Sequence, residues 1–202
     1  MIRKLRSFIR RDEGSAAIEY VALLLPLIAL VFTSLQIALA YHFSLTAQKA
    51  VELGARIAAV RDAVHTGLPT TNELDDASGL GVGDACGFGA CVAPGGPWTC
   101  SGATVATDPN CDVAKFNEIR DEVARLAYLL DDDDLSITYS YALLGFADGP
   151  FVPVVEVAIV ERPFFLQFFF NLAFGSGEDD SFEVTLPSVA ATAIAEDLSS
   201  TN

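Results

Sequence analysis

The stretch EGSAAIEYVALLLPLIALVFTSLQIALAY, residues 13–41, decides the fold of this 202-residue chain. No formally charged residue lies between Glu19 and Lys49. Such a run is apolar on every side of a helix, and it exceeds the roughly 20 residues that a helix needs to cross a bilayer. The sequence therefore predicts a transmembrane helix with a carboxylate, that of Glu19, at the edge of its apolar run.

The helical pattern continues past the apolar run, so we expect one helix over residues 15–62. Ser15 can cap its start, and Pro26 removes an amide donor inside it, which predicts a kink. At about 1.5 Å per residue this helix is on the order of 70 Å long, so its second half must leave the bilayer or pack on a partner. From Leu45 onward, small and apolar residues recur at helical spacing: Ala47, Ala50, Val51, Gly54, Ile57 and Ala58.

Charge is distributed very unevenly along the chain. Residues 1–14 form a basic leader, whereas the whole chain has a net charge of −15. A short basic flank before an apolar span predicts a cytoplasmic N-terminus, which places the acidic bulk on the periplasmic or extracellular side of the inner membrane. The acidic balance argues against nucleic acid as a partner, because phosphate binding needs clustered Lys and Arg.

The four cysteines, Cys86, Cys91, Cys100 and Cys111, all lie in a Gly-rich loop, residues 63–111. An even number of cysteines in an exported segment indicates disulfides, for which three connectivities are possible. We favour Cys86–Cys91 and Cys100–Cys111, because pairing neighbours requires the least ordering of the chain. The alternative is a zinc site, but no C-x-x-C spacing is present, and we expect neither a metal nor another cofactor.

Residues 112–202 have the pattern of an α+β domain. Asp112 can cap a helix over 113–130, with an apolar stripe at Phe116, Ile119, Val123, Leu126 and Leu130. Three strands are expected after it, in LSITYSYAL (135–143), VPVVEVAIVE (152–161) and the segment 181–197. The predicted fold is thus a long N-terminal transmembrane helix followed by a pilin-like domain with a helix on a small antiparallel sheet.

No sequence motif supports catalysis. The chain lacks the G-x-S-x-G, H-E-x-x-H and phosphate-loop patterns. We therefore expect a protein that is not an enzyme.

Several interpretations of the N-terminus compete. A plain membrane anchor leaves Gly14 and Glu19 unexplained. A cleaved secretory signal could end at Ala38-Leu39-Ala40, but the preceding segment is longer than a usual signal core and the helical pattern runs through the site. A twin-arginine signal fits less well, because Asp12 and Glu13 follow the two arginines.

Another interpretation rests on Gly14, Glu19, Pro26 and KAVELGARIAAV (residues 49–60). Over residues 10–61 this arrangement resembles the TadE/TadG-like pseudopilins of the tight-adherence (Tad/Flp) type IV pilus system, with a class III prepilin processing site. The resemblance implies that a prepilin peptidase cuts between Gly14 and Ser15, which makes Glu19 the fifth residue of the mature chain. It also implies roles in assembly and register for Glu19, Tyr20 and Pro26.

Cleavage would create a positive amine on Ser15, which could pair with Glu19 of a neighbouring subunit. Small residues at 15–17 would allow helices to approach closely. The expected function is that of a membrane pseudopilin, a minor component or assembly factor of a Tad-type pilus used for adhesion or secretion. The resemblance implies a minor role because the main subunits of such pili are little more than the helix. The expected partners are the peptidase, other pilin subunits and membrane lipid. The alternative is an uncleaved bitopic protein whose exported domain binds a ligand or surface.

Overall fold

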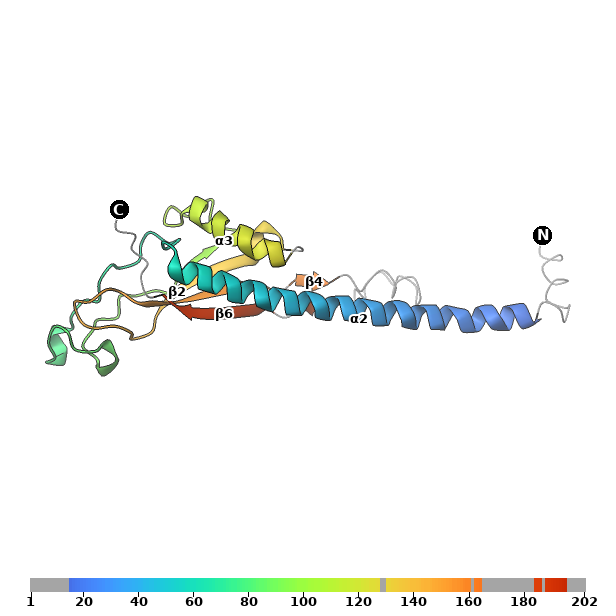
Figure 1. The fold of residues 1–202 in the computed structure, drawn as a ribbon, viewed down its shortest axis with the longest axis horizontal. Coiled ribbons are helices and arrows are strands. Elements are labelled where there is room, and N and C mark those ends of the chain that lie inside the picture. Colours follow the sequence, from blue (N-terminus) through green and yellow to red (C-terminus); the bar gives the residue numbers. More distant parts are fainter. Residues whose placement is uncertain (1–14, 128–129, 161, 165–183, 187, 196–202) are drawn as a thin grey trace. The chain divides into compact units, whose positions relative to one another are not determined.

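A computed structural model describes residues 15–127, 130–160, 162–164, 184–186 and 188–195. The chain divides into two compact units. The N-terminal unit comprises Met1–His42 and Pro163–Thr185, and the α+β unit comprises Phe43–Arg162 and Leu186–Asn202. Figure 1 shows a long helix, a shorter helix and a sheet, which confirms the predicted α+β class.

The long helix α2 comprises Ser15–Val60 and continues through Pro26. Its surroundings change along its length. Large apolar side chains are exposed from Ile18 to Tyr41, whereas Phe43, Ala47, Ala50 and Val51 are buried. The expected amphipathic face is therefore confirmed in the second half of the helix, which forms part of the core of the α+β unit.

The α+β unit is built on a four-stranded antiparallel sheet with strand order β1-β2-β3-β6. These strands are Trp98–Ser101, Leu135–Tyr141, Pro153–Ile159 and Val189–Ile194. Their register aligns Cys100 with Ile137, Ile137 with Val157 and Val157 with Ala191. Two further short strands, β4 (Arg162–Phe164) and β5 (Val184–Leu186), pair with each other in a separate sheet.

Two details of the strand prediction were wrong. Strand β1 lies in the segment that was expected to be a loop, because four residues are too few to show a two-residue period. It is held by pairing with β2 and by the disulfide of Cys100. The single strand expected within 181–197 is instead two, since β5 pairs with β4 and β6 with β3.

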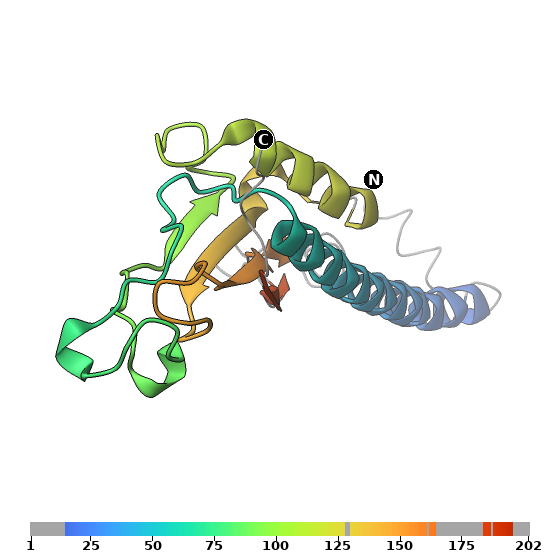
Figure 2. The ribbon, with the colours of Figure 1, turned by 60° about the vertical axis from the view of Figure 1, so that its left-hand side comes forward.

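Helix α3 (Val113–Leu126) lies with α2 on one face of the sheet (Figure 2). The carboxylate of Asp112 accepts hydrogen bonds from the amides of Ala114 and Lys115, as the capping prediction required. Phe116, Ile119 and Val123 of the predicted stripe are buried. The helix ends four residues before the expected position, and Leu126 is exposed rather than packed.

The sheet separates an apolar face from a hydroxyl-rich face. Alternate residues of β2 and β3 point into the core, among them Leu135, Ile137 and Val157. On the other face the hydroxyl groups of Thr99 and Thr138 hydrogen-bond across the strands at 3.0 Å. The described helices cover only the apolar face of the sheet. The second face carries small polar side chains, which need no such cover.

Residues 70–92 and the loop 143–151 together form what we call the distal lobe. The distal lobe has a second, smaller cluster of buried residues at its centre. It contains the short 3-10 helices η2 (Asp76–Ser78) and η3 (Cys86–Phe88). The buried Asn72 side chain donates to the carbonyl oxygens of Leu144, Phe146 and Pro150 and so ties the two segments together. A third 3-10 turn, η4 (Asp132–Asp134), precedes β2.

Two tyrosines of β2 allow a test of how the core is held. The hydroxyl of Tyr139, a fully buried residue, accepts a hydrogen bond of 3.1 Å from the buried amide of Val64, just after α2. Burial raises the pKa of the Tyr139 hydroxyl, and the hydrogen bond from the Val64 amide opposes this rise. The hydroxyl of Tyr141 is also buried but has no hydrogen-bond partner among the described residues.

We predict that Tyr139→Phe lowers the free energy of unfolding by about 1–3 kcal/mol, because it leaves the Val64 amide buried and unpaired. The matched control, Tyr141→Phe, removes a hydroxyl that has no such role and should leave stability unchanged or slightly raised. Chemical unfolding of the full-length protein in detergent micelles measures both. Equal losses for the two variants would contradict the assigned hydrogen bond.

Candidate functional site

The first half of α2 is the candidate functional site, and it begins where the sequence predicted processing. The helix starts at Ser15, while Gly14 lies outside the described residues. Glu19 is exposed on the helix surface, next to Tyr20, of which 66% is exposed. The described part of the chain therefore offers the Glu19 carboxylate to solvent or to another molecule.

The segment after Glu19 has the length and composition of a membrane span. It contains no other charged side chain before Lys49. None of its apolar window is buried in protein, and Leu23, for example, is 72% exposed. A core helix of a soluble protein would have buried these side chains, so α2 is a membrane-span candidate near the N-terminus.

Two hydroxyl side chains within this span bond to the backbone of the helix itself. The hydroxyl of Thr33 donates to the carbonyl oxygen of Ala29 at 2.8 Å, and that of Ser34 donates to Val31. Such back-bonding satisfies the hydroxyls without water. Pro26 lies exposed in the same segment and donates no hydrogen bond to the carbonyl of Ala22.

Gly54 is the residue at which α2 packs most closely on the rest of the α+β unit. The sequence placed it on the buried face of the helix, but no sequence pattern showed why glycine is needed there. A Cβ atom at this position would lie 2.7 Å from Cγ2 of Val123 on α3 and 3.2 Å from Cγ1 of Val157 on β3. Both distances are shorter than a normal contact, so the backbone of α2 passes too close for any side chain. At this residue the helix therefore lies directly against side chains of the sheet and of α3.

The four cysteines form two separate disulfides, Cys86–Cys91 and Cys100–Cys111. This is the pairing that the spacing of the cysteines favoured. The first lies in the buried cluster of the distal lobe, and the second lies in the main core. Neither is near Glu19 in the sequence, and all four sulfur atoms are used in these bonds.

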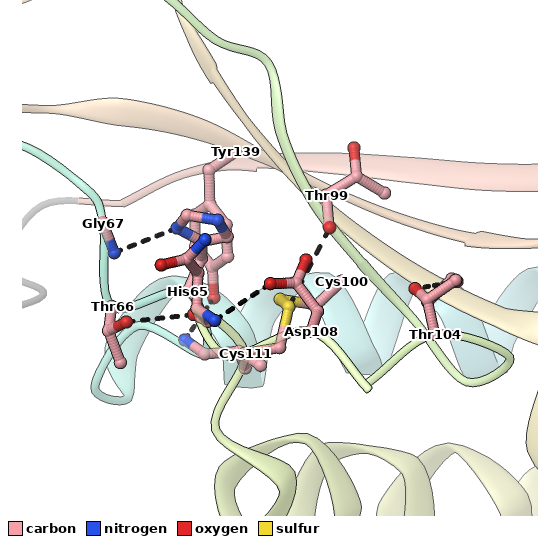
Figure 3. The surroundings of a disulfide bond; sticks show 12 residues. His65, Thr66, Gly67, Thr99, Cys100, Thr104, Asp108, Cys111 and Tyr139 are labelled. Atoms are coloured by element: carbon pink, nitrogen blue, oxygen red, sulfur yellow. Dashed lines mark hydrogen bonds between the residues drawn. A yellow bond between two sulfur atoms is a disulfide. The ribbon is translucent and has the colours of Figure 1, made fainter. Parts of the chain in front are cut away.

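Figure 3 shows the second disulfide beside His65, Thr66 and Gly67, in the segment that follows α2. The chain leaving the helix runs antiparallel to the segment around Cys111, with Asp112 donating its amide proton to Val64 and Thr66 donating to Asn110. The buried His65 accepts a hydrogen bond at Nδ1 from the Gly67 amide at 3.0 Å.

Charged groups just after α2 pair with charged groups of α3. Arg61 pairs with Glu118 at 2.7 Å, and Lys115 pairs with Asp62 at 3.6 Å. These residues line an open groove between the end of α2 and α3. Within the described ranges, no group of three or more His, Cys, Asp or Glu side chains could hold a metal ion.

Comparison with known proteins addresses the N-terminal region. Residues 14–56 match the family of TadE-like proteins. The matched segment begins at Gly14 and contains Glu19, Pro26 and Gly54, so the resemblance noted from these residues is confirmed over this region. Searches of curated proteins and of solved structures found no match.

The close approach at Gly54 predicts an effect opposite to the usual one. Gly→Ala within a helix normally stabilises by roughly 0.5–1 kcal/mol. We predict that Gly54→Ala instead lowers the free energy of unfolding by about 1–3 kcal/mol, because Val123 and Val157 must move. Glu52→Ala, at an exposed position of the same helix, is the control and should have little effect. A stabilising Gly54→Ala would show that α2 does not pack as described.

Proposed function

We propose that this chain is a TadE-like membrane pseudopilin, a minor component or assembly factor of a Tad-type pilus that serves adhesion or secretion. The observation that carries the proposal is the family match over residues 14–56. It covers Gly14 and Glu19 together, and the helix that bears Glu19 has exposed apolar side chains. A structural role of this kind requires no catalytic residues.

In the proposed mechanism, a prepilin peptidase cuts the bond between Gly14 and Ser15. The new α-amine of Ser15 then pairs with the Glu19 carboxylate of an adjacent subunit. An unpaired charge at the edge of an apolar span is costly, and removing one partner of a poorly solvated pair costs roughly 3–5 kcal/mol. A wrong axial register would leave both charges alone, so the pair selects the stagger between neighbouring helices.

The proposed topology places the leader in the cytoplasm and the α+β unit in the periplasm or outside the cell. The basic leader supports this orientation under the positive-inside rule. The two disulfides support it as well, because such bonds persist in oxidising compartments and are rare in the cytosol. The membrane lipid and the helices of other pilin subunits would then surround α2.

An uncleaved bitopic protein is the rival proposal. It would share the span, the orientation and the disulfide-bonded domain, and its function would lie in what that domain binds. The two proposals differ in whether Glu19 has a task, because an anchor needs no carboxylate at the edge of its apolar run.

We predict that Glu19→Lys abolishes assembly, because it places a second positive charge where the Ser15 amine should bind. Glu19→Gln should reduce assembly by removing the attraction while keeping the shape. The control is Glu156→Lys, an equal charge reversal at an exposed position of β3. Pili counted in sheared fractions from cells that carry each variant give the measurement, with membrane insertion checked by fractionation. Normal piliation with Glu19→Lys would favour the rival proposal.

A further inference from the structure

The distal lobe holds apolar side chains out in solvent. Phe88 lies within the six-residue ring closed by Cys86–Cys91 and is 85% exposed, and Val82 is 70% exposed. Each is flanked by two glycines, in GVG and GFG, so neighbouring side chains do not cover it. Phe146 of the adjoining loop is exposed as well.

These exposed residues stand on a fixed framework. The amide of Cys86 donates to the carbonyl of Gly145, and the amides of Gly83 and Ala147 bond to Ala147 and Asp84 respectively. Gly145 has a φ of 89°, and a Cβ there would lie 2.7 Å from Nδ2 of Asn72. The lobe therefore presents its apolar tips from a framework held by hydrogen bonds and one disulfide, which lowers the entropy cost of docking.

The charge of the lobe limits what can dock on it. Residues 70–92 contain four acidic residues and no Lys or Arg, and Asp148 adds another carboxylate. Such a surface repels anionic lipid headgroups and nucleic acids. It fits a surface that is apolar and basic at once.

The same chain carries a surface of that kind. One exposed face of α2, which we call the α2 stripe, comprises Leu45, Lys49, Leu53, Arg56 and Val60, with the exposed Glu52 at its edge. Its apolar members are exposed, Val60 by 78%. Arg61, which follows α2, and the basic side chains of α3 form ion pairs, but Lys49 and Arg56 of α2 form none with the described residues. Both cations are thus available to an acidic partner.

We propose that the distal lobe of one copy docks on the α2 stripe of a second copy. Phe88 and Val82 would contact the leucines and Val60, and the lobe carboxylates would face Lys49 and Arg56. In Figure 1 the lobe lies beyond the C-terminal end of α2, so the two surfaces meet only between copies offset along the helix direction. The contact is head-to-tail, and a contact of this type can propagate along a filament.

This inference goes beyond the proposed function, because it assigns a contact to the α+β unit and does not require cleavage after Gly14. A charge-reversal cycle in the full-length protein tests it. One variant carries Lys49→Glu and Arg56→Glu, a second carries Glu73→Lys and Asp76→Lys at exposed positions of the lobe, and a third carries all four changes. The control, Arg120→Glu with Arg125→Glu, makes the same charge change on α3. Self-association is measured by sedimentation equilibrium in a neutral detergent at low salt.

Each two-residue reversal should weaken self-association on the order of tenfold, and the four-residue variant should restore it. The α3 control should associate as the wild type does. A photoreactive benzoylphenylalanine at position 88 should crosslink to residues 45–60 of a second copy. Failure of the four-residue variant to recover would overturn the proposal. So would an effect of the lobe reversal without one of the α2 reversal, which would indicate a partner of another kind.

Discussion

The structure depends on one helix being compatible with two surroundings. Helix α2 exposes large apolar side chains over its first half and packs small ones over its second, and the change occurs near Phe43. Gly54 allows the helix backbone to approach Val123 and Val157 at distances that no side chain would permit. Residues of the sheet, of α3 and of the Cys100–Cys111 disulfide share one core with the second half of α2. The α+β unit is therefore built around that half of the helix.

The elements with a strong sequence period could be predicted, and those held by distant contacts could not. The face of α2 from Ala47 to Ala58 and the cap at Asp112 followed from helical spacing and capping chemistry alone. Strand β1 was missed because its four residues form a strand only by pairing with β2. The roles of Asn72 and Tyr139 depend on partners more than 70 residues away, and no local pattern indicates them. For Gly54, a glycine on an otherwise apolar helix face was the signal that could have been used.

The two disulfides stabilise different parts of the molecule. Cys100–Cys111 joins β1 to the segment before α3 and lies in the core shared with α2. Cys86–Cys91 closes a ring in the distal lobe, where little apolar surface is buried. Burying so few residues stabilises the lobe too little to offset the conformational entropy lost when the loop becomes ordered. A disulfide reduces that entropy cost, so it contributes most to the stability of such a small cluster. The long Gly-rich segment is therefore an ordered surface and not a linker.

We propose that Gly14 and Glu19 act together in assembly: cleavage after Gly14 creates the Ser15 amine, which pairs with the Glu19 carboxylate of another subunit. The most direct measurement is the intact mass and N-terminal sequence of the protein purified from cells that contain a prepilin peptidase. The account predicts that the mature chain begins at Ser15 and lacks residues 1–14. A chain that keeps Met1 and its leader in those cells would contradict it.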